Sequence, residues 1–494
     1  MGEPGALRWR SLRRDGTFHP VVSAPQPVAL AYRAADRHPW VEAVLRERFG
    51  AEAERVERAI HADDEMLEHS WRSNGGDLDA ALAGYFASGQ RVAASVEQLV
   101  VQRFGGWNRI GSLLDFGCGY GRVTRFLKLR LARDRIFASD ILAGALEFQR
   151  SQLGVQTFPS TVDPAALHCD RKFDVIYVGS LFTHLPSSRF ADWFGRIAAL
   201  LEPGGLLAFT VHDEVLLPPH LEMPPEGLVF EPSSESRTLA GADYGSTWVT
   251  PTYVASAIQR FGRYQARREP RGMCDYQDLW LVTHRESSEL RDLSYDGGVA
   301  GHVERADLEL GRLELRGWAI HRGAHGVESI RVVLGGEEVG RCSRFERRDD
   351  LARALDDERF ADSGWHCDCK LPAPLRRSSE VVQIVARSTG GASNLLFTGS
   401  LEQLLYLVNR EAYQRHRQRV YELAEIVEAM KESRFWKLRR LWFRIKRLLG
   451  WTSENPEGPE IEKTDRRPKH EETIAAETPL GALADGRDPQ APGF

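Results

Sequence analysis

The sequence lacks the segments that carry a protein into or across a membrane. No apolar run in its 494 residues approaches the roughly 18 residues that a membrane-spanning helix requires. The first residues, MGEPGALRWRSLRRDG, are basic, but no apolar stretch follows them, so we expect no secretory signal peptide. Ala6 stands where a myristoylation signal carries Ser or Thr. We therefore expect a cytoplasmic protein.

Cysteine is scarce, and neither sign of charge dominates. Six cysteines in so long a chain do not make a disulfide framework. His366, Cys367 and Cys369 in GWHCDCK alternate tightly, which fits a β-strand better than a metal site, so we expect no bound metal. The formal net charge of −5 argues against a protein that binds nucleic acid over its whole surface, although a local basic patch stays open.

The residues that are present divide the chain into several parts. A chain of this length predicts two to four domains. Apolar residues first recur every three or four positions, as in helices, then form short runs that alternate with helical stretches, and finally form alternating strands such as SIRVVLGG. The expected parts are a flexible N-terminus at 1–25, a helical region or lid at 26–104, an α/β domain at 105–290, a β-sandwich at 295–400, a long helix at 401–432, a basic amphipathic helix at 433–451 and a disordered tail at 452–494.

The clearest chemical signal is the segment SLLDFGCGYGRVTRFLKLRLARDRIFASD. A strand ends in Asp115, a turn carries Gly117, Gly119 and Gly121, and a second strand ends in Asp140. Glycines let the backbone approach a ligand closely, and an acid at the end of the second strand can accept both ribose hydroxyls. The spacing differs from the dinucleotide pattern G-x-G-x-x-G and suits a nucleoside with a charged amino-acid tail. As alternatives, the first acid could cap the turn and the second could be an ordinary strand-end residue.

At these residues the chain resembles the class I S-adenosylmethionine-dependent methyltransferases. FDVIYVGSLFTHLP resembles the fourth-strand motif of that family, and LLEPGGLLAFTVH resembles the turn and fifth strand. The segments YGSTWVTPTYVASAIQRFG and DYQDLWLVTHR resemble the last helix and the closing antiparallel strands. The likeness covers residues 85–285. It implies a Rossmann-like, seven-stranded α/β domain, preceded here by helices and followed by an all-β sandwich and a long helix.

The resemblance also implies S-adenosylmethionine as cofactor and a set of residues that hold it. The glycine turn and its acid would hold the methionine part, Asp140 the ribose, Ile141 and the loop at Val162 the adenine, and the end of the fourth strand would face the sulfonium. The cofactor-binding residues are therefore Asp115, Gly117, Gly119, Gly121, Asp140, Ile141, Val162, Gly179 and Ser180. Cys118, within the turn, is expected to pack as a small hydrophobic residue.

Two histidines are candidates for a catalytic base, which an alcohol acceptor would require. His184 in SLFTHLP and His212 in FTVHDE follow the fourth and fifth strands, and histidine ordinarily titrates near neutral pH. Each could instead anchor a loop or contact the substrate. Asp213 and Asp278 are weaker candidates. Upstream, GYFASGQ around Tyr85 could fold over the cofactor or simply pack as a helix.

The alternating strands resemble an accessory β-sandwich that accompanies enzymes of bacterial surface-glycan assembly. The positions that carry this likeness are Gly317, Trp318, Arg348, Asp349, Gly364 and Trp365. The two tryptophans could stack on sugars or lie in a core. The likeness suggests O-methylation of a sugar on a lipid-linked glycan or surface polysaccharide. The alternatives are a soluble methyltransferase for a small molecule and a scaffold that no longer catalyses.

The C-terminal part of the sequence suggests two kinds of partner. Residues 401–432 show an imperfect heptad pattern, which allows a coiled coil that would join copies of the chain. In 433–451, FWKLRRLWFRIKRLLGW places an apolar arc opposite basic residues, and we expect it to bind an anionic membrane surface from the cytoplasmic side. A partner protein or single-stranded nucleic acid is the alternative ligand. We expect no nucleic acid, because binding it would leave the apolar arc in water.

Overall fold

The computed structural model describes residues 10–12, 18–20, 38–74, 76–232, 239–286, 290, 293–323, 325–355, 357–372 and 380–408. Within the stretch predicted to be flexible, β1 (Arg10–Leu12) and β2 (Phe18–Pro20) form an antiparallel pair. The helix predicted at 401–432 is described only as α10 (Leu401–Val408). The basic helix at 433–451 and the tail at 452–494 lie outside the described residues.

Three helices precede the main sheet: α2 (Pro39–Phe49), α3 (Glu65–Ser73) and α4 (Leu78–Phe104). Short polar side chains start two of them, because Asp64 accepts a hydrogen bond from the Met66 amide and Asp77 from the Ala80 amide. The longest, α4, ends at Gly105 in a left-handed conformation that glycine adopts without strain. None of the helices in the described part of the chain combines the length and apolar character needed to cross a bilayer.

The central sheet has the order β10-β11-β7-β6-β3-β4-β5, with a further pair, β8 and β9, joined to β7. Its strands are β3 (Leu113–Phe116), β4 (Ile136–Asp140), β5 (Gln156–Pro159), β6 (Phe173–Val178), β7 (Leu201–Asp213), β8 (Leu228–Glu231), β9 (Ser246–Val249), β10 (Tyr264–Met273) and β11 (Gln277–His284). Strands β3 to β7 run parallel, while β11 is antiparallel to β7 and β10 to β11. Strands β4 and β6 lie on opposite sides of β3, so the order of the strands reverses there. Open α/β sheets bind ligands at such a switch point.

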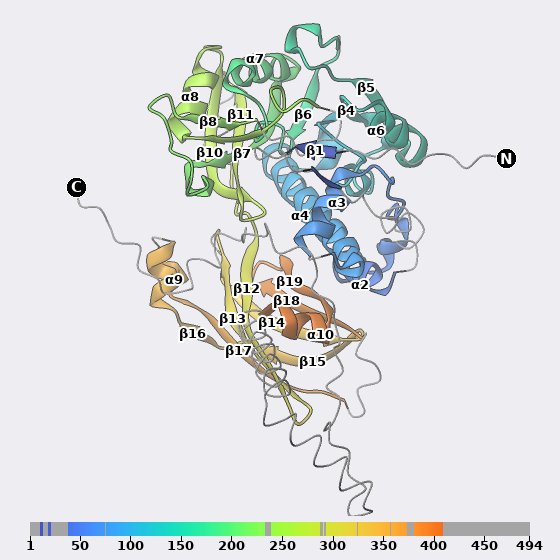
Figure 1. Ribbon diagram of the computed structural model, residues 1–494, viewed down its shortest axis with the longest axis vertical. Helices are drawn as coiled ribbons and strands as arrows, with labels where there is room; N and C mark the ends of the chain where they lie inside the picture. Colours follow the sequence, from blue (N-terminus) through green and yellow to red (C-terminus); the bar gives the residue numbers. More distant parts are fainter. Residues whose placement is uncertain are drawn as a thin grey trace, which may run out of the picture.

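Helices cover both faces of this sheet (Figure 1). One face packs against α4 together with the short helices α5 (Thr124–Leu127) and α6 (Ala143–Phe148). The other packs against α7 (Ser187–Ala198) and α8 (Pro251–Gln259). The strands are therefore buried on both sides, which explains their nearly continuous apolar sequence. This is a Rossmann-like α/β domain.

The following residues form two antiparallel sheets of four strands each. The first has the order β12-β13-β17-β16 and the second β15-β14-β18-β19. Their strands are β12 (Val299–Glu309), β13 (Arg312–His321), β14 (Val327–Leu334), β15 (Glu337–Cys342), β16 (Phe345–Arg347), β17 (Asp362–Lys370), β18 (Val381–Ser388) and β19 (Ser393–Ser400), and α9 (Asp349–Ala354) joins β16 to β17. Apolar residues of both sheets share one core, so the sheets lie face to face as two layers.

Side-chain placement in this sandwich decides two questions that the sequence left open. Trp318 and Trp365 are each 1% exposed, so they belong to the core and present no ring to a sugar. GWHCDCK lies in β17 as a strand. Cys367 and Cys369 point into the core with their sulfur atoms 3.5 Å apart, and His366, one position away, faces the other side.

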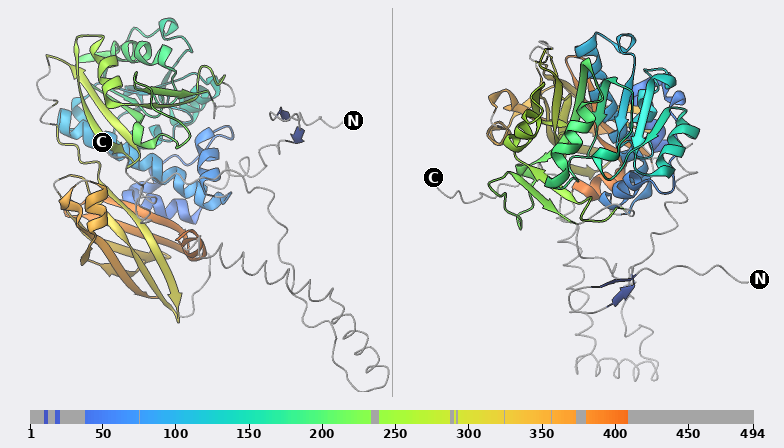
Figure 2. Two further views of the ribbon diagram at one scale, coloured as in Figure 1. Left: turned by 60° about the vertical axis from the view of Figure 1, so that its left-hand side comes forward. Right: turned by 90° about the horizontal axis from the view of Figure 1, so that it is seen from above.

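The helical layer lies between the α/β sheet and the sandwich (Figures 1 and 2). Both α2 and α4 contact β19 of the sandwich, and α4 also contacts α5 of the α/β domain. An ion pair of 2.7 Å joins Arg331 of β14 to Glu47 of α2. The Gln98 side chain donates to Asp296 at 2.6 Å, just before β12. The sandwich is thus attached to the layer on which the α/β domain rests.

Candidate active site

A cavity of about 220 Å³ opens at the carboxyl ends of the parallel strands. The ends of β3, β4 and β6 form its floor, and the beginning of α3 and residues of α7 form its sides. Most of the predicted cofactor-binding residues line it: Asp115, Gly117, Gly119, Asp140, Ile141, Val162, Gly179 and Ser180. The cavity therefore brings together residues that the sequence separates by up to 65 positions.

The three glycines of the turn all have positive φ, but their surroundings differ. At Gly119 (φ 51°) an added Cβ would meet nothing within 4 Å, so the backbone faces open space in the cavity. At Gly117 the nearest atom to such a Cβ would be Leu181 Cβ, at 3.9 Å. At Gly121 an added Cβ would lie 2.4 Å from Leu153 Cδ1, and this residue does not line the cavity. Gly121 thus allows close packing behind the turn, whereas the sequence predicted a contact with the cofactor.

Asp140 ties the glycine turn to the next loop. Its Oδ2 accepts from the Gly119 amide at 2.8 Å, and its Oδ1 accepts from the Leu142 amide at 2.9 Å. Burial raises the pKa of this carboxyl group, and the two amide donors oppose that rise. Each carboxylate oxygen keeps a second lone pair, so the carboxylate can still accept from a ribose diol.

Asp115 is both a cavity residue and an anchor. Its Oδ2 accepts from the Thr124 hydroxyl at 2.7 Å, which fixes the first residue of α5. Burial raises the pKa of Asp115 to about 6, and the nearby Arg122 opposes that rise. Both sequence interpretations of this acid, cavity lining and local anchoring, are therefore compatible with its position.

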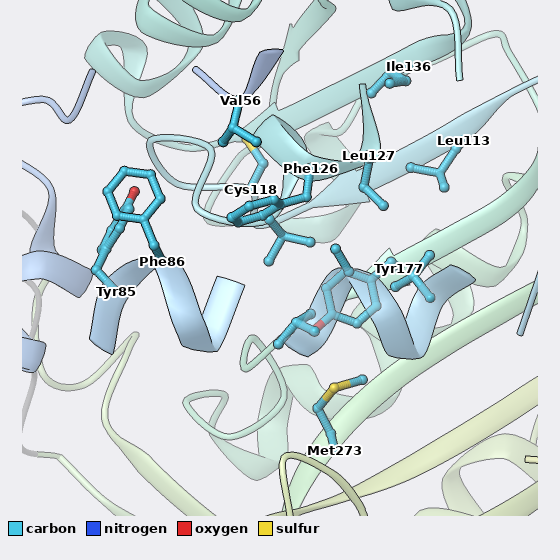
Figure 3. Packing of buried hydrophobic residues seen from close by; sticks show 14 of the residues in the cluster. Val56, Tyr85, Phe86, Leu113, Cys118, Phe126, Leu127, Ile136, Tyr177 and Met273 are labelled. Atoms are coloured by element: carbon cyan, nitrogen blue, oxygen red, sulfur yellow. The ribbon is translucent and has the colours of Figure 1, made fainter. Parts of the chain in front are cut away.

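Apolar side chains border one edge of the cavity. Met66 at the start of α3 and Val162 after β5 are 40% and 38% exposed, although both line the cavity. Ile141 joins them from the end of β4. Such walls suit the flat apolar face of a purine. Cys118 also lines the cavity, but it packs among apolar side chains, and burial raises its pKa well above the ordinary range (Figure 3).

The end of β6 makes a tight corner in the cavity wall. At Gly179 an added Cβ would lie 2.5 Å from the Tyr177 hydroxyl, so only glycine fits there. Ser180 follows with φ 59°, which is unusual for a residue that carries a side chain. Its amide donates to Thr210 Oγ1 at 2.8 Å, and its hydroxyl accepts from Gln277 Nε2 at 3.0 Å. Neighbouring strands thus hold Ser180 in place.

The two candidate histidines occupy different positions. His184 lines the cavity, its Nδ1 lies 2.7 Å from the Gly245 carbonyl oxygen, and its ring stacks on Tyr244 at 4.3 Å. Because a carbonyl can only accept, Nδ1 carries the proton and Nε2 is the basic nitrogen. His212 does not line the cavity, and burial lowers its pKa to about 3. It is a neutral and very weak base that supports the cavity wall from behind.

The two weaker candidates, Asp213 and Asp278, are held in a structural pair. Arg268 donates to Asp278 at 2.5 Å and to Asp213 at 3.4 Å. Neither carboxylate lines the cavity. Through Arg268 they hold the last residue of β7 beside the beginning of β11.

Several residues of the site carried no recognisable signal in the sequence. Arg189 at the start of α7 and Asp243 form an ion pair of 2.8 Å, and both line the cavity beside His184. Arg125 is fully buried and donates to the carbonyl groups of Glu57 and Ala59, each at 2.9 Å. It thereby fixes the segment before α3 against the glycine turn. Their roles depend on contacts between distant parts of the chain.

The helix predicted as a lid has a supporting role at the turn. On α4, an added Cβ at Gly89 would lie 2.3 Å from the Arg122 carbonyl oxygen, so helix and turn are in close contact. Ser88 accepts from Arg122 Nη1 at 3.1 Å. The Tyr85 hydroxyl donates to Asp64 at 2.6 Å. The residues that border the cavity from this side are Asp64, Glu65 and Met66 at the start of α3.

Part of this chain is similar to known methyltransferases. Residues 114–207 match a family model described as a methyltransferase domain. A trans-aconitate 2-methyltransferase of Methylobacterium radiotolerans is 31% identical over 107 residues, which cover 22% of this chain and 40% of that protein. A second one, of Rhizobium leguminosarum bv. trifolii, is 30% identical over 115 residues, which cover 23% and 44%. This chain thus spans less than half the length of these curated relatives.

Among solved structures, the DhpI-SAH complex is similar over 44% of this chain and 95% of that chain, with 15% sequence identity and a TM-score of 0.31.

The Rossmann-like sheet, the glycine turn and the acid at the end of β4 define a nucleoside-binding domain. Residues 114–207 of this domain match a methyltransferase domain model, and S-adenosylmethionine is the cofactor. The residues fit this molecule, because the turn is open at Gly119 and Asp140 can accept from a ribose. Five acidic and two arginine side chains line the cavity, so its charge also suits a sulfonium cation.

Proposed function

We propose that this chain transfers a methyl group from S-adenosylmethionine to a hydroxyl group. One observation carries the proposal: a single cavity joins the open glycine turn and Asp140 to His184. The cofactor supplies an electrophilic methyl group on a sulfonium. The acceptor hydroxyl would replace the sulfonium at the methyl carbon, with S-adenosylhomocysteine as the leaving group, and Nε2 of His184 would take the hydroxyl proton. The Gly245 carbonyl fixes the tautomer that this step requires.

The proposed acceptor is a sugar of a bacterial surface polysaccharide or lipid-linked glycan, methylated at the membrane. Two features of the sequence support this acceptor. The segment 433–451 carries seven basic and no acidic residues beside large apolar ones, and each basic residue near an anionic surface contributes about 1 kcal/mol to binding. The sandwich resembles accessory domains of glycan-assembly enzymes. Its two buried tryptophans add no sugar-binding surface, so the sandwich acts as a scaffold in this proposal.

A small carboxylic acid is the second candidate acceptor. Arg189 lines the cavity beside His184 and pairs there with the carboxylate of Asp243 at 2.8 Å. A substrate carboxylate could take the place of Asp243, because arginine binds carboxylates in a planar, two-point geometry. The names of the curated relatives point to an acid of this kind.

An acceptor assay separates these proposals. The purified full chain would be given S-adenosylmethionine and one of three acceptors: a lipid-linked oligosaccharide in anionic vesicles, the free oligosaccharide, or trans-aconitate. We expect S-adenosylhomocysteine and methylated glycan to form together with the first acceptor. Turnover with trans-aconitate alone would establish the second candidate. Cofactor binding without turnover of any acceptor would favour a scaffold that no longer catalyses.

Vesicle sedimentation tests the proposed membrane contact. We expect the full chain to pellet with anionic vesicles and much less with neutral ones. A variant with Arg440, Arg444 and Arg447 all changed to Glu should lose this dependence, because it reverses three charges of the basic face. Equal pelleting of the wild type with both kinds of vesicle, or no pelleting, would contradict the proposal.

A further inference from the structure

Backbone strain is concentrated where the β10–β11 hairpin turns. Five residues with side chains have positive φ in the described part of the chain. Cys274 (57°) and Asp275 (60°) form this turn, and Arg271 (49°) lies just before it, in the irregular last part of β10. A fourth is Ser180 in the cavity wall. Such conformations cost of the order of 1–3 kcal/mol each, and they persist only where surrounding contacts enforce them.

Two arginines from different parts of the molecule enforce the turn. Asp275 Oδ1 accepts from Nε of Arg322, which follows β13 of the sandwich, at 3.1 Å. Asp275 Oδ2 pairs with Arg91 of α4. The side chains of Asp275 and Arg322 are 12% and 19% exposed, so water screens this pair only weakly. The Tyr295 hydroxyl adds a hydrogen bond of 2.6 Å to the Gly272 carbonyl, also from the sequence that leads into the sandwich.

The turn is directly connected to the cavity. Gln277, two residues after Asp275, donates from Nε2 to the Ser180 hydroxyl at 3.0 Å, and the same nitrogen lies 3.3 Å from Nε2 of His212. The Tyr276 ring meets the His212 ring edge-on at 5.3 Å. On the other side of the turn, Met273 packs in the same apolar cluster as Tyr177, whose hydroxyl borders Gly179 (Figure 3). Movement of the turn would therefore move the corner at the end of β6.

We propose that Arg322, Asp275 and Arg91 are positioning residues through which the sandwich holds the Ser180 wall of the active site. The sandwich would then help to fix the shape of the active site, in addition to any role in placing the protein at a membrane. The proposal rests on the proposed function only in assigning the cavity to the cofactor and its acceptor. The contacts themselves are independent of that assignment.

The chain provides a matched control for this proposal. Arg331 of the sandwich also forms an ion pair with the helical layer, at 2.7 Å to Glu47, and its side chain is 23% exposed. This pair does not touch the hairpin. Arg322→Gln and Arg331→Gln therefore remove comparable interdomain ion pairs, and only the first releases Asp275.

Hydrogen–deuterium exchange on the full-length variants tests the connection without any turnover. We expect Arg322→Gln to increase exchange in peptides covering 273–284 and 178–185, and Arg331→Gln to leave both unchanged. In a Gln277→Ala background, Arg322→Gln should affect 178–185 less than in wild type, because one of the two connections, the Gln277 side chain, is absent and only the packing of Met273 with Tyr177 is left. Asp275→Asn serves as a second variant of the same pair if Arg322→Gln does not fold.

Cofactor-product binding gives a second readout. We expect Arg322→Gln to weaken the binding of S-adenosylhomocysteine roughly fivefold or more, as in typical couplings between distant sites, and Arg322→Lys to restore part of it. Equal effects of Arg322→Gln and Arg331→Gln on exchange at 178–185, or no effect of either, would overturn the proposal. If wild type does not bind S-adenosylhomocysteine, the proposed function fails, while the exchange experiment still decides on the positioning residues.

Discussion

The two ends of the cavity are built in different ways. At the cofactor end, the turn after β3 and the acid after β4 are separated by fewer than 30 residues, and backbone amides make the important contacts. At the end proposed to bind the acceptor, here called the acceptor end, His184 is held by Gly245, Ser180 by Gln277, and Arg189 by Asp243. These contacts join distant segments through side chains.

Because the two ends are built differently, we expect substitutions at one end to alter cofactor binding and substitutions at the other to alter catalysis or specificity. The cofactor end depends on the backbone conformation of the glycine turn. Few substitutions are tolerated in this turn, because its conformation favours glycine. The acceptor end depends on side chains from α7, β7, β11 and the loop before β9, and substitutions there can alter specificity while the fold persists. We therefore expect variants at the two ends to separate cofactor binding from catalysis.

The largest separation is expected at His184. His184→Ala should lower kcat by about 10²- to 10⁴-fold, because the proposed base is lost, while S-adenosylhomocysteine binding changes little. His184→Asn should be equally slow, although its side-chain amide can still donate to the Gly245 carbonyl. The measurement is kcat at saturating cofactor with whichever acceptor is turned over in the acceptor assay, with the exposed His220→Ala as control. Recovery of activity in His184→Asn would show that His184 only anchors the loop.

Two glycines of the turn provide a sharper test within the cofactor end. Both alanine variants incur the strain of positive φ, about 1–2 kcal/mol. Gly121→Ala should lose a further 1–3 kcal/mol or so of folding stability, because its Cβ would overlap Leu153 in the core. Gly119→Ala should mainly lose cofactor binding, since its Cβ points into open space.

Denaturant unfolding and calorimetric titration of both glycine variants measure the two effects. Equal stability and equal binding in the two variants would contradict the different roles assigned to these glycines.

The smallest effect concerns His212, which supports the acceptor end. Its folded pKa of about 3 lies below the ordinary value near 6.5, so the unfolded chain binds more protons between these values. The stability contributed by neutral His212 is complete above about pH 6.5 and falls as the pH decreases, by up to about 1.4 kcal/mol per pH unit. His212→Asn should therefore lose less stability than wild type between pH 7 and pH 5, as measured by denaturant unfolding. An unchanged pH dependence would mean that His212 is accessible to protons and could act as a base.

The same contrast explains what the sequence could predict. The glycine turn and Asp140 were recognisable because their roles depend on neighbouring residues and on the ends of consecutive strands. The turn determines the conformation of Gly121, but its packing against Leu153 determines why glycine is needed there. Leu153 lies 32 positions away, so the spacing of the glycines does not reveal this contact. Arg125, Arg189 and Gln277 carried no signal, since their partners come from other segments. The order of strands and helices in the α/β domain followed from periodicity, whereas the burial of Trp318 and Trp365 required the packing of two sheets.

The most direct test of the central claim is calorimetric titration of S-adenosylhomocysteine into wild type and Asp140→Asn, with the exposed Asp192→Asn as control. We predict one-to-one binding by wild type and by the control. Asp140→Asn should bind at least about tenfold more weakly, a loss of about 1.4 kcal/mol, while remaining folded. No binding by wild type, or equal affinity in wild type and Asp140→Asn, would contradict the assignment of this cavity to S-adenosylmethionine.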